Sequence, residues 1–209
     1  MSQVIGIDFD NTLICYDEVL HSLAVREAWI SPAVASQKTV IRDAIRNSPG
    51  GDSRWQQLQA LTYGIAIQHA RPYEGIPLFF RACKKSGASV FIVSHKTETA
   101  WLNQQRVQLR QQALHWMQGM GFFSPDGLGL RLEQVFFESS RSEKISRIRA
   151  LKCTHFIDDL AEVFAEPDFP SNVIKILFAP KANTPGATDV RAFESWVEIT
   201  NWFSRTNGK

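Results

Sequence analysis

The feature that most constrains this chain is a short apolar run near the N-terminus that ends in acidic residues. Val4–Ile7 is rich in β-branched side chains, a composition that suits a buried parallel strand. Asp8 and Asp10 follow one residue apart, before Asn11 and Thr12. Two carboxylates at the end of a buried strand repel each other unless one takes up a proton or a cation binds. The stretch therefore predicts a cation site, and the alternative is a turn whose Asp or Asn caps the next helix.

The rest of the chain alternates apolar segments with helical patterns. Further strands are predicted at residues 88–93, 135–137, 155–157 and 173–178. Helices are predicted at residues 17–30, 36–46, 53–69, 76–85, 99–119, 143–151 and 189–203. Strands separated by helices imply an α/β fold, in which a parallel sheet is covered on both faces. Ligands of such sheets bind beyond the carboxyl ends of the strands. The polar residues that follow these ends are Asp8, Asp10, Ser94, Asp158 and Asp159.

Four motifs in the chain resemble those of the haloacid dehalogenase-like (HAD) phosphohydrolases. The first is DFDNT at residues 8–12, and the second is a strand that ends in Ser94. Lys144, on the helix before the fourth strand, resembles the third motif, and FIDD at residues 156–159 resembles the fourth. The motifs stand in the order that the family shows and extend over residues 4–159.

The resemblance implies a Rossmann-like sheet of five parallel strands in the order 3-2-1-4-5, numbered along the chain, with a small α-helical cap. Only about sixteen residues lie between the third and fourth strands, too few for a cap. The predicted domains are therefore a catalytic core of residues 1–16 and 73–209 and a helical cap of residues 17–72. Several cap residues are either candidates for substrate contact or ordinary cap surface and core: Arg26, Arg42, Arg46, Arg54 and Trp55.

The resemblance also implies the chemistry. It makes Asp8 the nucleophile that attacks phosphorus and becomes an aspartyl phosphate. It makes Asp10 the acid that protonates the leaving oxygen and then the base that activates water. Ser94 would bind a phosphoryl oxygen, and Lys144 would neutralise Asp8 and the phosphoryl group. The predicted substrate-binding residues are Asn11, Thr12, Ser94, His95 and Lys144. The implied activity is hydrolysis of a small phosphate monoester.

The expected cofactor is Mg²⁺, a hard cation that prefers oxygen ligands. By resemblance its ligands are the Asp8 carboxylate, the main-chain carbonyl of Asp10 and the side chains of Asp158 and Asp159. Charge supports a cation independently of the family. Four ionised aspartates and one lysine would leave three negative charges, which would repel a phosphate dianion unless a divalent cation offset part of them.

Some of these assignments have alternatives in the sequence. Lys152 competes with Lys144, but it lies only six residues before Asp158, in the turn that enters the strand at the wrong end of the sheet. Ser94 is also a plausible N-cap for the segment after it. His95 and Lys96 either orient substrate or water or are surface residues.

Other functions are compatible with the same motifs. A phosphotransferase would share the covalent step, and a binding or regulatory protein would keep the fold without turnover. A dehalogenase is disfavoured, because the halide-removing members of the family lack an acid at the position of Asp10.

Net charge, hydropathy and cysteine content limit the kinds of partner and compartment that we expect. The formal net charge of +2 gives no indication of nucleic-acid binding, and no apolar run approaches the length of a membrane span. Three separated cysteines, Cys15, Cys83 and Cys153, predict buried free thiols rather than a disulfide framework. We therefore expect a cytoplasmic protein acting on a small molecule, and its oligomeric state stays open.

Overall fold

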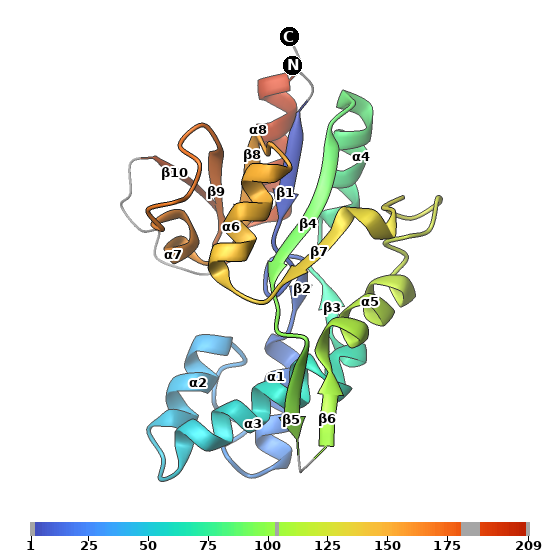
Figure 1. The fold of residues 1–209 in the computed structure, drawn as a ribbon. Coiled ribbons are helices and arrows are strands. Elements are labelled where there is room, and N and C mark those ends of the chain that lie inside the picture. The colour runs from blue at the N-terminus through green and yellow to red at the C-terminus, as the bar shows by residue number, and fades with distance from the viewer. Residues whose placement is uncertain (1–2, 103–104, 181–188, 208–209) are drawn as a thin grey trace. The chain divides into compact units, whose positions relative to one another are not determined.

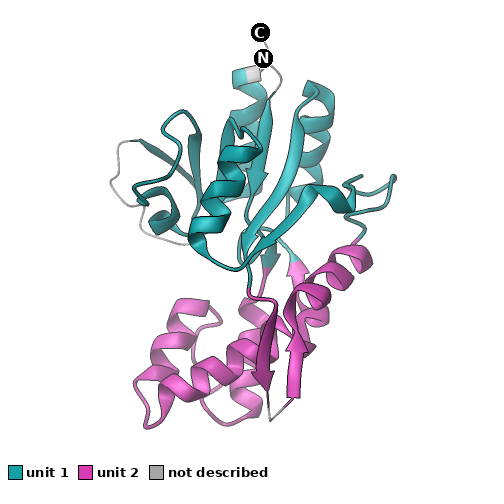
Figure 2. Cartoon of the chain, viewed as in Figure 1, with its two compact units in different colours: residues 1–14, 72–96, 121–209 teal, residues 15–71, 97–120 magenta. Residues whose placement is uncertain are grey.

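The chain divides into two compact units (Figure 2). The computed structural model describes residues 3–102, 105–180 and 189–207. Unit 1 comprises residues 1–14, 72–96 and 121–209, and unit 2 comprises residues 15–71 and 97–120. Unit 2 thus contains the segment predicted as a cap, apart from Pro72, together with a second segment that the sequence analysis placed in the core. Its predicted role as a substrate-selecting cap stays a prediction.

Unit 1 is built on a six-stranded sheet in the order β10-β9-β8-β1-β4-β7, with every neighbouring pair parallel (Figure 1). The strands are β1 (Val4–Ile7), β4 (Ser89–His95), β7 (Val135–Glu138), β8 (His155–Asp158), β9 (Ile174–Phe178) and β10 (Val190–Phe193). The first five of these strands along the chain lie in the predicted order 3-2-1-4-5. The predicted α/β fold is therefore confirmed. The predicted number of five strands is wrong because β10 adds a sixth at the edge beside β9.

The strand β10 was not predicted, because the spacing of large apolar residues there is typical of a helix. Phe193, Trp196 and Ile199 recur at helical intervals, which predicted one helix from residue 189 to 203. The helix α8 instead begins at Trp196 and ends at Asn207. Before it, residues 190–193 pair in register with residues 175–178 of β9. Backbone pairing at a free sheet edge therefore overrides the local helical pattern.

Helices cover both faces of this sheet (Figure 1). On one face, α4 (Ile76–Ser86) packs against α8 through the aromatic rings of Phe79, Trp196 and Phe203. On the other face lies α6 (Arg141–Ala150), whose Ile145 and Ile148 join a buried cluster with Phe156. Two short helices complete the described part of the unit, η2 (Leu132–Gln134) and α7 (Ala161–Phe164).

Unit 2 is mostly helical. Its helices are α1 (Asp17–Arg26), α2 (Lys38–Arg46), α3 (Gly51–Tyr63), η1 (Ile65–His69) and α5 (Leu109–Gly119). Two very short strands, β2 (Ile14–Cys15) and β3 (Arg71–Pro72), pair where the chain passes from one unit to the other. Among the described helices of the whole chain, none is long and apolar enough to cross a membrane.

The predicted helix over residues 99–119 is wrong in its first half. β5 (Thr99–Leu102) and β6 (Gln105–Gln108) form an antiparallel pair before α5 begins. The many Gln and Arg side chains of this segment favour helix. Its few apolar residues, however, suit a strand pair that buries Leu102 and Val107 in a cluster with Ala60 and Leu109. Tertiary burial thus decides the local structure here.

The three cysteines are free thiols. Burial raises the pKa of Cys83 to about 12 and that of Cys153 to about 11. Thiols with such pKa values stay protonated at neutral pH and act as small apolar side chains.

Candidate active site

The register of three neighbouring strands brings the first and fourth motifs together. Ile7 of β1 lies opposite Ile92 of β4 on one side and Ile157 of β8 on the other. The backbone N–H of Asp8 donates to the carbonyl of Ile157 over 2.9 Å, which continues the ladder by one residue. Because parallel strands end at the same edge, Asp8 and Asp158 emerge there side by side.

Lys144 joins these two acids. Its Nζ lies 2.6 Å from Asp8 Oδ1 and 2.6 Å from Asp158 Oδ2, and all three residues are buried. The start of α6 explains how the lysine reaches this edge. The Ser140 hydroxyl accepts from the backbone N–H of Glu143, and the Glu143 carboxylate accepts from the backbone N–H of Ser140. This capping box fixes the N-terminus of the helix.

The first turn of α6 therefore carries Lys144 at the carboxyl edge of the sheet. Lys152, its competitor in the sequence, lies in the turn after α6 and has a left-handed φ of 54°. The helix separates the two lysines, so only Lys144 is placed at Asp8.

Burial controls the ionisation of this group. Desolvation raises the pKa of Asp8 to about 6, with Lys144 acting against the rise and Asp158 adding to it. Burial alone would lower the pKa of Lys144, but the charges of Asp158 and Asp8 outweigh it and raise that pKa above the usual value. Lys144 is thus an ammonium at neutral pH, while the ionised form of Asp8 needs further positive charge nearby.

Three carboxylates at this edge can hold a cation. Asp8, Asp158 and Asp159 each offer one oxygen, and these atoms lie within 4.8 Å of one another. The hydroxyl of Thr12 donates to Asp159 Oδ1 over 3.3 Å and so helps to orient that side chain. An all-oxygen, anionic donor set suits Mg²⁺, and a cation there would also favour the ionised form of Asp8. The residues present therefore fit the expected metal.

The turn after β1 gives a structural reason for the residues of the first motif. Asn11 has a left-handed φ of 60°, a conformation that Asn adopts more readily than most residues. The N–H groups of Leu13 and Ile14 both donate to the carbonyl of Phe9, which closes the turn. Thr12 is fully buried, and its carbonyl accepts from the indole N–H of Trp196 over 2.9 Å. Substrate contacts by Asn11 and Thr12 stay predictions.

Ser94 ends the second motif near the carboxyl end of β4, opposite Phe137 of β7. Its hydroxyl is buried and has no hydrogen-bond partner among the residues that the structure describes. An unsatisfied buried hydroxyl is costly, which makes Ser94 available for a ligand oxygen. The N-cap alternative is not observed, because β4 continues through Ser94 to His95.

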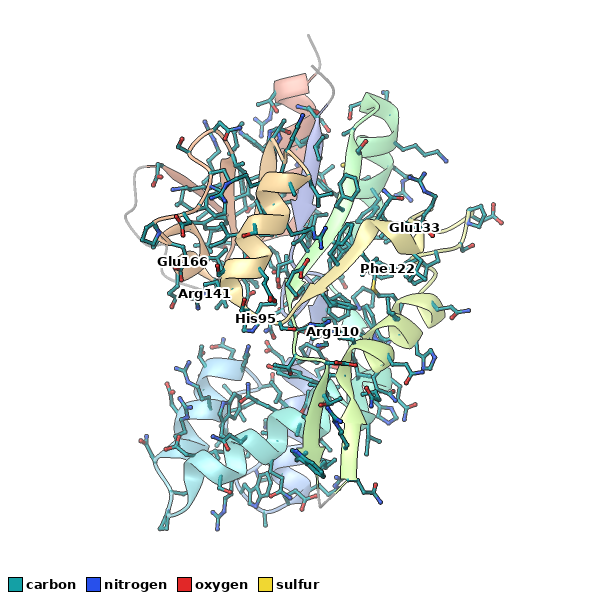
Figure 3. All side chains as sticks on the ribbon, viewed as in Figure 1. His95, Arg110, Phe122, Glu133, Arg141 and Glu166 are labelled. Carbon is teal, nitrogen blue, oxygen red and sulfur yellow. The ribbon has the colours of Figure 1, made fainter. Side chains whose placement is uncertain are left out.

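His95 is exposed at the end of β4 (Figure 3). Its Nε2 lies 3.1 Å from the carbonyl of Ser139, which can only accept, so this nitrogen donates. The contact ties the end of β4 to the loop before α6. A substrate contact by His95 stays a prediction.

The sequence analysis left Lys96 between two roles, and the structure places it on Asp10. Its Nζ donates to both carboxylate oxygens over 2.9 Å each, and the lysine is buried. One signal could have pointed to it: a lysine directly after a strand that ends at the site edge. With Lys144 and Lys96 both present, four aspartates and two lysines leave two negative charges rather than three.

The predicted cap residues make local contacts within unit 2. Trp55 is buried in its core at 3% exposure. The arginines pair with residues at most six positions away in the sequence: Arg26 with Glu27, Arg42 with Asp43, Arg46 with Asp52 and Arg54 with Ser48. Substrate contact by these arginines stays a prediction.

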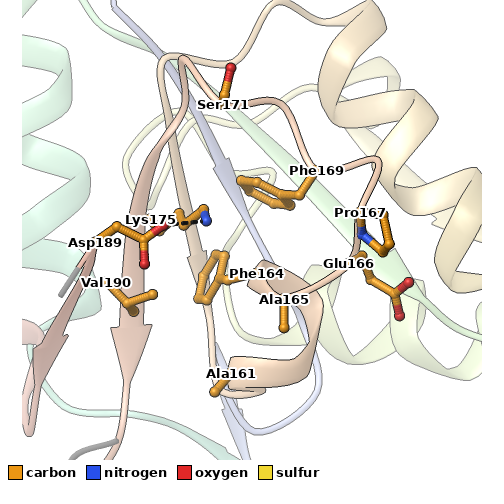
Figure 4. Close-up of a pocket in the computed structure, with 10 residues that line it drawn as sticks. All are labelled: Ala161, Phe164, Ala165, Glu166, Pro167, Phe169, Ser171, Lys175, Asp189 and Val190. Carbon is orange, nitrogen blue, oxygen red and sulfur yellow. Dashed lines mark hydrogen bonds and ion pairs between the residues drawn. The ribbon is translucent and has the colours of Figure 1, made fainter. Parts of the chain in front are cut away.

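A separate cavity of about 440 Å³ opens in unit 1 between α7, β9 and β10 (Figure 4). Phe164 and Phe169 line it on the apolar side, and the ion pair of Lys175 and Asp189, 2.6 Å long, lies at its polar side. Glu166 pairs with Arg141 over 2.7 Å (Figure 3). Among the described residues, the lining of this cavity includes none from the four motifs, so we do not assign the chemistry to the cavity.

Comparisons with known proteins bear on the fold. No protein-family model matches the sequence, and the comparison with curated proteins found no match. Among solved structures, a HAD hydrolase from Entamoeba histolytica is 12% identical, aligns over 100% of both chains and has a TM-score of 0.60. A HAD family hydrolase from Deinococcus radiodurans, solved with bound phosphate and sodium, is 13% identical, with 95% of this chain and 93% of its own covered and a TM-score of 0.56.

Dehalogenases occur among the similar structures as well. An L-2-haloacid dehalogenase is 14% identical, with 97% of this chain and 98% of its own covered and a TM-score of 0.55. At these identities the likeness concerns the fold. The chain has the haloacid dehalogenase-like fold.

Proposed function

We propose that this protein is a Mg²⁺-dependent phosphatase that hydrolyses a small phosphate monoester through an aspartyl phosphate on Asp8. One observation carries the proposal: Asp8 shares Lys144 with Asp158 and forms a carboxylate cluster with Asp158 and Asp159 at one edge of the sheet. A nucleophilic carboxylate beside a fixed ammonium and a hard-cation site is suited to a phosphoryl group, whose charge both can offset.

Substrate binding would use groups that the fold already holds in place. The hydroxyl of Ser94, buried and without a partner among the described residues, can donate to a phosphoryl oxygen. Lys144 Nζ, held between two carboxylates, lies where it can offset charge on the same group. Asp8, Asp158, Asp159 and the carbonyl of Asp10 would hold Mg²⁺. When bound, the metal would supply positive charge that lets the phosphate dianion approach the acids.

The first chemical step forms the phosphoenzyme. An oxygen of the Asp8 carboxylate attacks phosphorus, while Lys144 is hydrogen-bonded to Asp8 Oδ1 and can offset the developing charge. The bond between phosphorus and the leaving oxygen breaks, and Asp10 gives that oxygen its proton. Asp10 lies two residues after Asp8 in the turn that follows β1, with part of its carboxylate exposed, so it can reach a leaving group at the same site.

The second step regenerates the enzyme. A water molecule attacks phosphorus in the aspartyl phosphate, and Asp10, now a carboxylate, takes a proton from that water. The bond between phosphorus and Asp8 breaks, which restores the carboxylate and releases inorganic phosphate. The same acid thus serves both steps, first as donor and then as acceptor.

The site favours a phosphatase over the dehalogenase function that some similar structures have. Removal of a halide needs no proton donor for an oxygen leaving group, so Asp10 and its lysine partner would have no task there. The similar structure from Deinococcus radiodurans was solved with phosphate, which supports phosphate as a ligand of this fold.

The test is a panel of phosphate monoesters and short 2-haloacids, assayed with Mg²⁺ and after exhaustive chelation. We expect Mg²⁺-dependent phosphate release from esters, no halide release, and added phosphate mass on the peptide that carries Asp8. Asp8→Asn should abolish both turnover and the added mass. Halide release would favour a dehalogenase, and absence of any turnover would favour a binding or regulatory protein.

A further inference from the structure

Lys96 is a buried lysine that takes no part in the proposed chemical steps. It directly follows β4, and its backbone N–H donates to the carbonyl of Glu138 over 2.9 Å, next to the last pair of the β4–β7 ladder. Its side chain is 2% exposed, whereas the side chain of Asp10 is 19% exposed. Lysine is rarely buried to this degree unless its charge is paired. The ammonium therefore lies on the protein side of the Asp10 carboxylate, which keeps its access to solvent.

The ammonium of Lys96 is held by an aromatic ring as well as by the acid. Nζ lies 5.5 Å from the centroid of Phe9, within the range of a cation–π contact. Phe9 is itself fully buried and packs edge-on against Phe137 at 5.7 Å between centroids. The Phe9 ring is thus a fixed surface, and Lys96 reaches Asp10 from a defined direction.

The two site lysines bind different acids. Lys144 donates to Asp8 and Asp158, the acids of the proposed nucleophile and metal site. Lys96 donates to both oxygens of Asp10. Contact with both oxygens restricts rotation of the carboxylate as well as its position, which a bond to one oxygen would not do.

Asp10 lies in a turn rather than within a regular strand. Asp10 lies beyond the end of β1, and the next residue, Asn11, has a left-handed φ of 60°. An isolated bridge pairs Asp10 with Ile14, and the bond from Lys96 holds the carboxylate itself. A misplacement of about 1 Å in a reacting group can cost roughly 10²-fold in rate.

We propose that Lys96 is a positioning residue that holds the Asp10 carboxylate in the orientation needed for proton transfer to and from the phosphorylated site. This inference rests on the proposed function and assigns Lys96 a role that acts through Asp10. It predicts that removing the lysine impairs the step that depends most on Asp10, the hydrolysis of the phosphoenzyme.

The primary test uses Lys96→Met, which keeps the length of the side chain and removes the charge, with an activated aryl phosphate as substrate. We expect a rapid burst of released phenol, close to the wild-type burst, followed by steady turnover slowed about 10–10²-fold. Lys96→Arg keeps a charged donor and should recover part of that loss. A loss of structure would lower the burst amplitude, whereas a loss of positioning lowers only the rate after it.

The chain offers a control in Lys175, whose ion pair is more exposed than that of Lys96. This lysine also pairs with an aspartate, Asp189, at 2.6 Å and stands 5.6 Å from the centroid of a phenylalanine, Phe169, but it lies outside the four motifs. Lys175→Met should leave both the burst and the steady rate within about twofold of wild type. An equal fall in both lysine variants would overturn the specific role of Lys96.

A double-mutant cycle separates positioning from a general structural effect. In an Asp10→Asn background Lys96→Met should change the steady rate by less than about threefold, because the group it positions is already gone. If Lys96→Met costs as much in that background as in the wild type, Lys96 does not act through Asp10. If Lys96→Met does not fold, the same comparison is made with Lys96→Arg.

Failure of this inference is distinguishable from failure of the proposed function. If the wild-type protein forms no phosphoenzyme on Asp8, both the proposed function and the positioning role of Lys96 are wrong. If the wild-type protein forms that phosphoenzyme but the effects of Lys96→Met and Asp10→Asn are additive, only the positioning role is wrong.

Discussion

Lys144 Nζ lies 2.6 Å from Asp8 Oδ1, although the two residues are 136 positions apart in the sequence. The contact exists because β1 and β8 end at the same edge of the sheet and a capping box at Ser140 starts α6 beside that edge. The same ammonium serves Asp158 at the same distance. One side chain therefore balances two buried acids, and its removal should have consequences for stability as well as for turnover.

Lys144→Met should destabilise the metal-free protein by about 3–5 kcal/mol, because it leaves two buried carboxylates without their counter-charge. Turnover should fall to background. Chemical denaturation in the presence of a chelator measures the first effect. Lys152→Met, in the turn at the far end of α6, is the matched control and should stay within about 0.5 kcal/mol of wild type. Equal losses in the two variants would contradict the role given to Lys144.

Mg²⁺ should stabilise the wild-type protein, because it would bind the folded carboxylate cluster and not the unfolded chain. At a concentration of 100 times its Kd the gain is about 2.7 kcal/mol, measurable as a rise in Tm. Asp158→Asn should remove most of that rise. Asp189→Asn, which alters an aspartate of the same unit outside the cluster, should keep it. A Tm that responds to Mg²⁺ equally in all three proteins would argue against this site.

Ser94→Ala should separate function from stability. The Ser94 hydroxyl has no partner among the described residues, so its removal should leave the free energy of unfolding unchanged or raise it by about 1 kcal/mol. KM for a phosphate ester should rise at the same time. Thr62→Val in unit 2 is a suitable control, since the Thr62 hydroxyl is also buried and without a partner in the described part of the chain. That variant should be stable and fully active.

In the metal-free Asp8→Asn protein, the free energy of unfolding should fall as the pH drops below about 6.5, because of His155. Burial lowers the pKa of His155 from its usual 6.5, with the ring packed edge-on against Trp202 and Phe203. Below pH 6.5 the unfolded chain therefore binds a proton that the folded chain does not, and the free energy of unfolding decreases.

The pH test needs a background without Asp8, whose raised pKa changes the stability in the opposite direction over the same pH range. Burial raises the pKa of Asp8 to about 6, so metal-free Asp8→Asn is the appropriate background. In it, His155→Phe should flatten the dependence of stability on pH between 6.5 and 5. An unchanged slope would show that His155 is not the group responsible. The hydroxyl of Thr154 keeps its bond to the carbonyl of Val4 in this variant.

Much of the site could be predicted from the sequence because each motif follows a strand, and strand ends meet at one edge of a parallel sheet. The spacing before Asp158 was sufficient to prefer Lys144 over Lys152. The pairing of Lys96 with Asp10 was not predictable in the same way. Those residues lie 86 positions apart, and the sequence does not tell whether a lysine after Ser94 turns inward or toward solvent.

The parts of the fold that were not predicted share a physical cause. Residues 99–102, 105–108 and 190–193 are short segments for which local composition or apolar spacing predicted helix, and they are strands because they pair with neighbouring backbone. Leu102 of β5 and Val107 of β6 are both buried, in a cluster with Ala60 and Leu109. Local patterns of a few residues carry no information about such partners.

Asp10→Asn should uncouple the two chemical steps that we propose. The substitution keeps the main-chain carbonyl of residue 10 and removes the carboxylate that exchanges protons. Attack by Asp8 on an activated aryl phosphate needs little protonation of the leaving oxygen, so a burst of phenol equal to the enzyme concentration should still occur. Hydrolysis of the aspartyl phosphate needs a base, and its rate should fall by roughly 10²–10⁴-fold. Ordinary alkyl phosphates, with poor leaving groups, should show neither burst nor turnover.

The trapped intermediate provides the decisive measurement for Asp10→Asn. Peptide mapping after rapid acid quenching should find one added phosphate on the peptide that contains Asp8. The Asp8→Asn protein, treated identically, should carry none. Phosphate on Ser94 or His95, with Asp8 unmodified, would overturn the mechanism, because either residue would then be the nucleophile. A burst with no covalent phosphate on any residue would indicate direct attack by water, with Asp8 acting only as a ligand of the metal.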